Sequence, residues 1–219
     1  MKKFHFNKIA DVLSDLLYPK KCVVCQQGLS SLGKIALCDK CSASLPKTKV
    51  VRDDRFFFDE AIAFIPYEAS ARDAMIKYKF KSVKYCYKAY AHIISLAEKE
   101  RPYLKDAVIC PVPVSKTRDR DYSQTDLIAR ELGDIWKSRY IPDLLYRCRV
   151  VSQVSKMKLF ERKFYTSGSI DVHPRYDVYG KDVLVVDDIL TSGTTANECA
   201  RVLKIYGARN VYILCPCYD

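Results

Sequence analysis

The stretch Val183-Leu-Val-Val-Asp-Asp-Ile-Leu-Thr-Ser-Gly-Thr-Thr195 decides the fold of this chain. Residues 183–186 are continuously apolar and mostly β-branched, which indicates a strand buried on both faces of a parallel sheet. Two carboxylates, Asp187 and Asp188, follow at the carboxyl end of that strand, where open α/β sheets bind their ligands. Apolar residues then recur at near-helical spacing, so we predict a strand, a turn and a helix in succession.

The turn and the two acids offer groups that suit one ligand. The turn consists of small and hydroxyl-bearing residues, namely Thr191, Ser192, Gly193, Thr194 and Thr195. A helix that begins there presents free N–H groups and a positive dipole end, which together favour a phosphate. Asp187 and Asp188 can accept hydrogen bonds from two vicinal hydroxyls, so the stretch predicts a site for ribose 5-phosphate. The alternative is an ordinary helix start, in which the neighbouring acids would repel each other without benefit.

The cysteines suggest a metal site near the amino terminus. Cys22 and Cys25 form one Cys-x-x-Cys pair, and Cys38 and Cys41 form a second. Two such pairs supply four thiolates for a tetrahedral structural zinc site, with iron as the second choice. The alternative is redox chemistry or two disulfides, which we disfavour because the chain shows no secretion signal. Cys110, Cys199 and Cys215 fall in apolar patterns and are expected in the core.

Composition restricts the class of protein. The chain has 219 residues, 49% of them hydrophobic, and a formal net charge of +11. No apolar run approaches the roughly 20 residues of a membrane helix, so we expect no membrane span and a cytoplasmic location. The positive charge suits an anionic ligand or a nucleic acid.

Strands and helices alternate along the chain, which predicts an α/β fold with a parallel sheet flanked by helices. We expect strands at 61–67, 107–112, 181–187 and 211–216, a possible short strand within 140–150, and a helix at 123–137. We expect the inward face of that helix to carry Leu127, Ile128, Leu132, Ile135 and Trp136. Residues 1–50 are expected to form an amphipathic helix and the zinc module, and residues 51–219 the α/β domain.

A second turn follows the strand expected at 107–112. Its side chains suit a diphosphate because cations and backbone N–H groups can surround it. The residues concerned are Ser115, Lys116, Arg118 and Arg120. A further basic segment contains Lys156, Lys158 and Arg162 and is either a mobile functional loop or a solvated connection.

The stretch 183–195 resembles the 5-phosphoribosyl-1-pyrophosphate (PRPP) motif of type I phosphoribosyltransferases. Together with the paired cysteines and the turn that begins at Pro111-Val-Pro113-Val-Ser115, the chain as a whole resembles the ComF family of predicted phosphoribosyltransferases. The resemblance implies a type I phosphoribosyltransferase-like sheet, PRPP and Mg²⁺ as ligands, and a role in bacterial competence and DNA uptake. Asp187 and Asp188 would hold the ribose hydroxyls and residues 191–195 the 5′-phosphate.

The same resemblance implies how the remaining residues act. Lys116 and Arg118, with Arg120, would stabilise the departing pyrophosphate as catalytic groups, and the segment with Lys156, Lys158 and Arg162 would close over the site. Thr191 stands where purine-salvage members often carry an acid, so the chain is similar to orotate-type members in this respect. Neither the acceptor nor whether turnover occurs follows from the sequence.

A different class of function fits the same charge. Tyr78, Phe80, Tyr85, Tyr87 and Tyr90 lie among lysines, and stacking combined with positive charge is how proteins hold unpaired strands. The alternative function is therefore an accessory factor for uptake of single-stranded DNA, without transferase turnover. A third possibility is that the zinc module docks on a helicase or another DNA-uptake protein.

Overall fold

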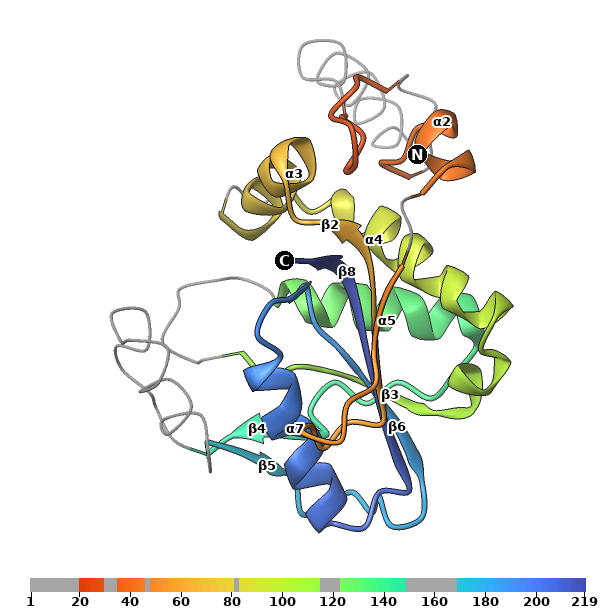
Figure 1. Ribbon diagram of the computed structural model, residues 1–219. Helices are drawn as coiled ribbons and strands as arrows, with labels where there is room; N and C mark the ends of the chain where they lie inside the picture. Colours follow the sequence, from red (N-terminus) through yellow and green to blue (C-terminus); the bar gives the residue numbers. More distant parts are fainter. Residues whose placement is uncertain (1–19, 30–34, 46–47, 81–82, 115–122, 149–168) are drawn as a thin grey trace, which may run out of the picture.

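A computed structural model of the chain describes residues 20–29, 35–45, 48–80, 83–114, 123–148 and 169–219. Its centre is a sheet with strand order β1-β2-β8-β6-β3 (Figure 1). The strands are β1 (Lys49–Val51), β2 (Glu60–Pro66), β3 (Val108–Pro111), β6 (Asp182–Val186) and β8 (Asn210–Tyr218). Neighbours run parallel except β1, which is antiparallel to β2, and the two-residue β7 (Ile189–Leu190) pairs with the end of β8. The predicted parallel α/β sheet is confirmed.

Helices cover both faces of the sheet (Figure 1). The helices α4 (Cys86–Ser95) and α5 (Gln124–Trp136) pack on one face, and α3 (Ala69–Phe80) stands beyond the carboxyl end of β8. The opposite face is covered by α7 (Thr194–Ile205) and by the antiparallel pair β4 (Leu145–Arg147) and β5 (Ile170–Val172). Two 3₁₀ helices, η1 (Leu96–Lys99) and η2 (Pro102–Asp106), connect α4 to β3. Two hydrophobic cores therefore lie back to back across the sheet.

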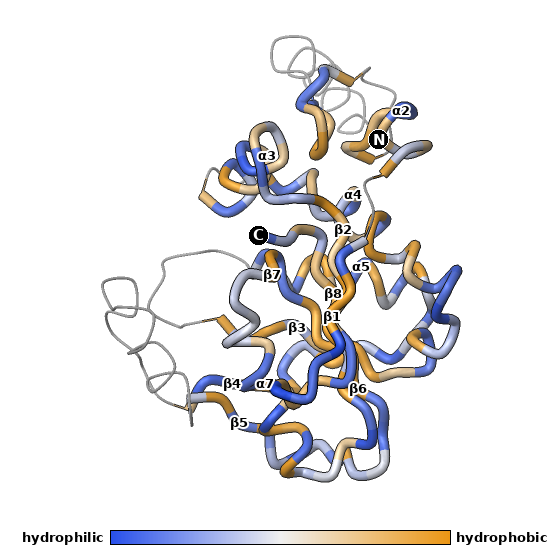
Figure 2. The backbone as a smooth tube through the Cα atoms, in the orientation of Figure 1, coloured by the Kyte–Doolittle hydropathy of each residue, from blue (hydrophilic) through white to orange (hydrophobic). Residues whose placement is uncertain are grey.

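The central strands are apolar along most of their length (Figure 2). Side chains of β8 alternate between the two cores as far as Cys215, with Leu214 on the α4 side and Cys215 on the α7 side. Cys217 lies in the core on the α4 side, so the alternation is broken between Cys215 and Cys217. Cys110, Cys199 and Cys215 are fully buried, as predicted. The strands expected from the sequence correspond to β2, β3, β6 and β8 with ends shifted by no more than two residues, and β4 lies in the segment expected to hold a short strand.

The prediction for the inward face of α5 is wrong at one residue. Ile128, Leu132 and Trp136 are buried, but Ile135 is 42% exposed. Ile135 stands in the last turn of the helix, one residue before its end at Trp136. Helical spacing places it at the edge of the apolar stripe, and because Trp136 beside it is buried, the helix turns Ile135 toward solvent.

The segment with the paired cysteines packs against the α/β domain (Figure 1). Val23 and Leu37 share a core with residues of α3 and α4, and the backbone N–H of Lys21 donates to the Tyr85 hydroxyl at 3.3 Å. A single short helix, α2 (Asp39–Ala43), occurs among the described residues of this segment. The expected domain boundary at residue 50 falls inside β1.

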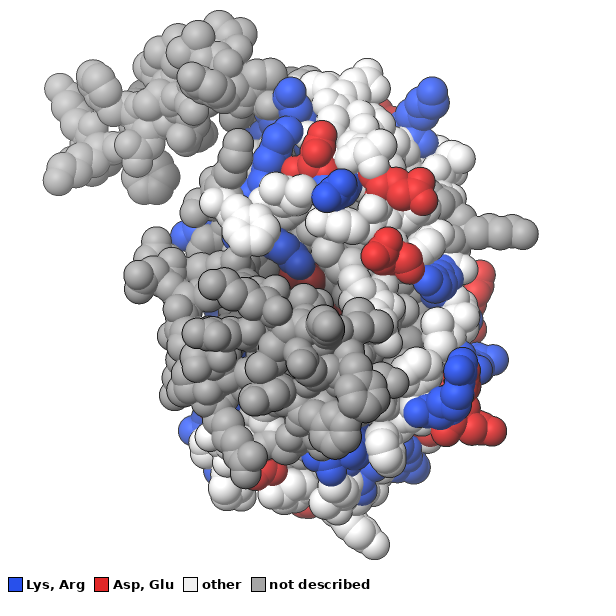
Figure 3. Space-filling model, turned by 60° about the vertical axis from the view of Figure 1, so that its left-hand side comes forward, with Lys and Arg blue, Asp and Glu red and all other residues white. Residues whose placement is uncertain are grey.

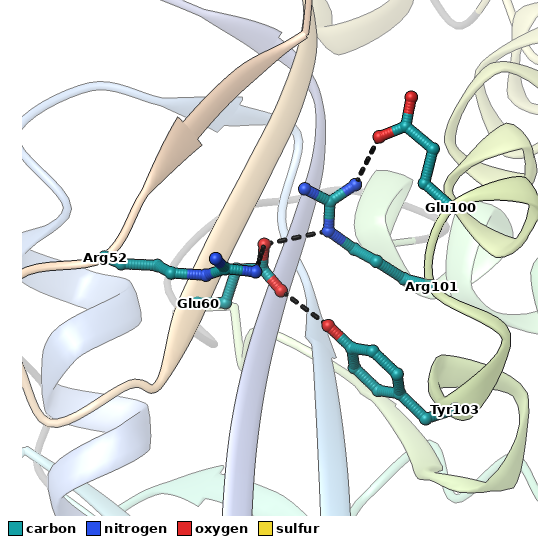
Figure 4. A network of polar contacts seen from close by, with 5 residues as sticks. All are labelled: Arg52, Glu60, Glu100, Arg101 and Tyr103. Atoms are coloured by element: carbon teal, nitrogen blue, oxygen red, sulfur yellow. Dashed lines mark hydrogen bonds and ion pairs between the residues drawn. The ribbon is translucent and has the colours of Figure 1, made fainter.

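A buried carboxylate organises the amino-terminal end of β2 (Figure 4). Glu60 is 2% exposed and accepts hydrogen bonds from Arg52 at 2.9 Å, Arg101 at 2.8 Å and the Tyr103 hydroxyl at 2.9 Å. Arg101 also pairs with the exposed Glu100. The network joins the start of the sheet to the connection between α4 and β3, at the opposite end of the strands from Asp187.

No helix within the described ranges is long and apolar enough to cross a membrane.

Candidate functional site

The two adjacent acids follow the carboxyl end of β6, an interior strand that lies between β8 and β3. Val186 is in register with Leu214 of β8, and the N–H of Asp187 continues the ladder to the Leu214 carbonyl at 3.0 Å. The Asp188 carbonyl accepts from the N–H of Cys217. The backbone of both acids is therefore fixed by a central strand, while their side chains are half-buried.

Each carboxylate uses one oxygen for a contact within the protein. Oδ1 of Asp187 accepts from the Asp188 N–H at 2.8 Å, and Oδ2 of Asp188 forms an ion pair with Lys79 Nζ at 2.8 Å. The second oxygen of each group has no partner among the described residues. Because both residues remain partly exposed, these oxygens can accept hydrogen bonds from a ligand.

The surroundings of Asp187 raise its pKa to about 7. Burial is the largest cause, since it disfavours the charged form, and the neighbouring charge of Asp188 acts in the same direction. The hydrogen bond from the Asp188 N–H and the charges of Lys79 and Arg147 oppose the rise. Asp187 is therefore near half-ionisation at neutral pH, which is unusual for an aspartate and typical of functional sites.

The turn after the acids leads directly into α7. Gly193 has φ 70° and occupies the residue before the helix, and no side chain caps the first turn of α7. The first N–H groups of the helix are therefore available to an anion, near the positive end of its dipole. Ser192 and Thr194 share a hydroxyl contact at 2.9 Å beside them.

A hollow of about 260 Å³, open to solvent, lies over this turn. Its lining combines one acid with the whole turn: Asp187, Ile189, Leu190, Thr191, Ser192, Gly193, Thr194, Thr195 and Ala196. An acid and an uncapped helix start thus border one polar depression. A phosphorylated polyol has the matching chemistry, with a phosphate for the turn and hydroxyls for the acid.

The rings of Phe56 and Phe58 lie next to Gly193 in the turn before α7. A Cβ atom added to Gly193 would lie 3.6 Å from the Phe56 ring, and Phe56 stacks on Phe58 with ring centroids 4.7 Å apart. The Phe57 N–H donates to Asn197 Oδ1 of α7 at 2.6 Å. Sequence analysis missed this support because residues 56–58 carry no motif and reach the turn only through the fold.

Two basic residues that sequence analysis did not assign to the site lie beside the acids. Lys79 of α3 pairs with Asp188, and the charge of Arg147 at the end of β4 acts on Asp187. Arg147 Nε also donates to the Pro113 carbonyl at 3.0 Å, close to the start of the expected diphosphate turn. Both residues stood in basic stretches of the sequence, but only the fold shows which of the cations there approach Asp187 and Asp188.

Several predicted residues lie outside the described ranges. They are Ser115, Lys116, Arg118 and Arg120 of the diphosphate turn, and Lys156, Lys158 and Arg162 of the basic segment. Their proposed roles remain predictions.

The aromatic surface expected for nucleic acid is not continuous. Tyr78 and Tyr90 are fully buried, with ring centroids 5.5 Å apart, so neither can stack on a base. Only Phe80, at 65% exposure, is largely open to solvent. Over the described part of the face in Figure 3, Lys and Arg side chains are interspersed with Asp and Glu. The helical packing of α3 and α4 explains the error, because their tyrosines alternate between the core and the surface.

The four cysteines of the paired motifs converge as predicted. Their sulfur atoms all lie within 4.8 Å of one another, and Cys25 Sγ is 3.8 Å from Cys38 Sγ. Zinc–sulfur bonds of about 2.3 Å in a tetrahedron imply sulfur–sulfur edges of about 3.8 Å. The thiols are free rather than joined in disulfides. The donor set therefore fits a tetrahedral zinc ion.

Backbone N–H groups point at these sulfur atoms, as expected for thiolates. The N–H of Cys38 donates to Cys22 Sγ at 3.5 Å, and the N–H of Cys41 donates to Cys38 Sγ at 3.4 Å. The second of these hydrogen bonds is the main reason that the pKa of Cys38 is lowered to about 7. All four positions are protein ligands, so a bound ion would have no open position for catalysis.

The part of the chain that contains this site is similar to a known domain family. The model of the phosphoribosyl transferase domain family matches residues 135–219, which include the acids and the turn. Ribose-phosphate pyrophosphokinase of Thermococcus kodakarensis is 32% identical over 96 residues, 39% of this chain and 34% of that protein. DNA utilization protein YhgH of Escherichia coli O6:H1 is 28% identical over 116 residues, 52% of this chain and 50% of that protein.

The chain thus spans half or less of the length of these relatives. Among solved structures, the glutamine PRPP amidotransferase from B. subtilis is similar, with 19% identity and a TM-score of 0.41. The similar region covers 59% of this chain and 25% of that one. Residues 135–219 are thus similar to the phosphoribosyl transferase domain.

Proposed function

We propose that the protein binds PRPP together with Mg²⁺ and transfers its ribose 5-phosphate to an acceptor. The observation that carries this proposal is the geometry at residues 187–195. Two half-buried carboxylates with one free oxygen each lie a short turn away from an uncapped helix start. The similarity of residues 135–219 to the phosphoribosyl transferase domain supports the same ligand.

The described residues have separate tasks in this proposal. The free oxygens of Asp187 and Asp188 accept the two ribose hydroxyls, and the backbone N–H groups at the start of α7 hold the 5′-phosphate. Ser192 and Thr194 add hydroxyl donors. Mg²⁺, when bound, would lie mainly among substrate oxygens and neutralise the charge of the diphosphate. These contacts hold the sugar so that its anomeric carbon faces the acceptor.

In the transfer, the bond between the anomeric carbon and the pyrophosphate oxygen breaks and a bond from the acceptor nucleophile forms. The bonding electron pair leaves with pyrophosphate, and the acceptor loses its proton. Lys116, Arg118 and Arg120 are proposed to stabilise the leaving group, and Lys156, Lys158 and Arg162 to exclude water. Loss of one such donor is expected to slow the reaction by roughly a hundredfold.

Release of pyrophosphate tests this proposal. Wild-type protein with PRPP and Mg²⁺ is screened against bases and amines, and pyrophosphate is measured by a coupled assay. We expect acceptor-dependent release that is lost in Asp188→Asn and retained in Asp134→Asn, a matched change at an exposed residue of α5. Release that is equally fast in the Asp188 variant contradicts the assignment.

The four-cysteine centre is proposed to bind zinc in a structural role. The residues from 20 to 45 are too few to form a core of their own, so an ion would supply much of their folding free energy. Metal analysis of purified protein is expected to find one zinc ion per chain, and a finding of no zinc or iron contradicts the proposal.

A second candidate function is suggested by one relative. The similarity to a DNA utilization protein favours a role in handling DNA, including single-stranded DNA and a helicase of the uptake machinery. Binding to labelled oligonucleotides would then weaken steeply with salt, because counterions are released from the strand. Competition by PRPP would show that the two ligands share a site.

A further inference from the structure

The last turn of α3 lies between the four-cysteine segment and the two acids. Lys77 and Lys79 are two positions apart, so they project on opposite sides of the helix, about 200° around its axis. Lys77 Nζ donates to Gln26 Oε1 at 3.1 Å, and Lys79 Nζ pairs with Asp188 Oδ2 at 2.8 Å. Gln26 in turn donates to the Cys22 carbonyl at 2.8 Å.

The backbone at Lys79 is held in place from within the core. Gln124 is 4% exposed and its Nε2 donates to the Lys79 carbonyl at 3.0 Å. The hydroxyl of the fully buried Tyr78 donates to the Gln124 carbonyl at 2.7 Å. Side chains of lysine usually move freely in solvent, but only 22% of the Lys79 side chain is exposed. These contacts therefore hold the ammonium group of Lys79 beside Asp188.

Within the described ranges, few other charges face the acids. Arg147 approaches from β4, and the remaining ionisable groups nearby are the Cys199, Cys215 and Cys217 thiols and the Tyr90 phenol. Burial raises the pKa of each of these four groups above its usual value, so they are neutral at physiological pH. Lys79 and Arg147 are thus the cations that balance two carboxylates among the described residues.

We propose that Lys79 is a positioning residue of the ribose site, which makes the acid pair selective for a neutral diol over a bare divalent cation. Its ammonium occupies Oδ2 of Asp188, fixes the carboxylate and leaves Oδ1 for a ribose hydroxyl. With Lys79 in place, its charge offsets that of one carboxylate, and Asp188 cannot offer both of its oxygens to a metal. This inference rests on the proposed binding of PRPP.

Binding measurements on matched lysine variants test this role. Lys79→Met keeps an unbranched side chain that is one atom shorter and removes its charge, and Lys79→Arg keeps the charge. Lys88→Met on α4 removes the same charge at an exposed position and serves as the control. In calorimetric titrations with PRPP and Mg²⁺ at pH 8, we expect roughly tenfold weaker binding for Lys79→Met, near wild-type binding for Lys79→Arg and no change for the control.

Titration with Mn²⁺ alone supplies a readout that does not depend on PRPP. At pH 8, above the pKa of about 7 of Asp187, Lys79→Met is expected to bind Mn²⁺ several-fold more tightly than wild type. An added Asp188→Asn change is expected to abolish that gain. A merely structural lysine would not produce this gain. Thermal unfolding of each variant confirms that the comparison is made on folded protein.

The outcomes separate the two proposals. If wild type binds PRPP and folded Lys79→Met binds both PRPP and Mn²⁺ as wild type does, the role of Lys79 is refuted and PRPP binding stands. If wild type does not bind PRPP, the proposed function fails, and the Mn²⁺ titration alone decides whether Lys79 governs cation access to the acids.

Discussion

At the scale of single residues, the properties of the site depend on where each side chain is placed. The sequence showed two neighbouring acids and a glycine-containing turn, and the structure brings Asp187 and the turn to one depression after the end of β6. It did not indicate that Asp187 would be half-buried with a pKa of about 7, nor that Lys79 would reach Asp188. Those features arise from contacts between residues far apart in the chain, which local patterns do not encode.

The raised pKa of Asp187 predicts a stability that depends on pH. The native carboxyl keeps its proton up to a pKa of about 7, whereas an unfolded aspartate releases it near its ordinary pKa of 3.8. The native state therefore binds more protons in this window, so rising pH destabilises it. Asp187→Asn removes this effect and is expected to gain about 1–3 kcal/mol at pH 8, allowing for partial exposure, and almost nothing at pH 4. Urea unfolding at both pH values measures the gain, and an equal gain at both contradicts the assignment.

Gly193 predicts a backbone effect. Its φ of 70° lies in the left-handed region, which costs residues with a Cβ about 1–2 kcal/mol. The added methyl of Gly193→Ala meets Phe56 at an ordinary contact distance of 3.6 Å, so strain rather than a clash is expected. We expect a loss of about 1 kcal/mol in denaturant unfolding and weaker phosphate binding. Gly28→Ala, where an added Cβ meets nothing within 4 Å, is the matched control. If Gly193→Ala has the same free energy of unfolding as wild type, the turn does not require the left-handed backbone at this residue, which contradicts the prediction.

At the scale of elements, the sequence predicted the strands that are buried on both faces and the helices that cover them. Their patterns are long and apolar, so packing agrees with local preference. Short or exposed elements were missed. The strands β1, β5 and β7 have two or three residues each and depend on pairing with longer partners. The alternative nucleic-acid surface included Tyr78 and Tyr90, which are buried, because the order of residues in the sequence does not say which tyrosines face the sheet.

The network around Glu60 predicts a stability effect that leaves the ligand site intact. Glu60→Gln leaves Arg101, whose side chain is 13% exposed, without its buried partner. Breaking a buried ion pair typically costs about 3–5 kcal/mol. Glu100→Gln removes the other partner of Arg101, which is 75% exposed, and is expected to cost less than about 1 kcal/mol.

Thermal unfolding measures both variants, and PRPP affinity is expected to remain at the wild-type value in each. The network lies at the amino-terminal end of β2, whereas the acids follow the carboxyl end of β6. Equal losses of stability in Glu60→Gln and Glu100→Gln would contradict the central role of Glu60 (Figure 4).

At the scale of the whole molecule, the α/β sheet, α3 and the four-cysteine segment form one connected structure. Val23 and Leu37 share a core with α3 and α4, so the four-cysteine segment supports the helix that carries Lys79. The matched spacing of the cysteine pairs predicted that their sulfurs would converge. The packing of the four-cysteine segment against α3 could not be predicted. No pattern in the sequence of this segment indicates which helix it contacts.

Removal of the metal therefore has an expected effect at a distance. Treatment with a strong chelator is expected to lower the unfolding temperature and to weaken PRPP binding several-fold, because the segment that supports α3 loses its folding free energy. Restoring zinc should recover both properties. A metal-free protein that binds PRPP as tightly as the zinc form, with Mg²⁺ supplied in excess, would show that the two centres are independent.

The most direct test of the account is calorimetric titration of the protein with PRPP and Mg²⁺, compared with the double variant Asp187→Asn/Asp188→Asn. We expect saturable binding of one PRPP per chain by the wild type. Because two hydrogen bonds to charged acceptors are lost, the folded double variant is expected to bind at least about a hundredfold more weakly. Equal affinity of the two proteins, or no binding by the wild type, would contradict the assignment of residues 187–195 as a ribose-phosphate site.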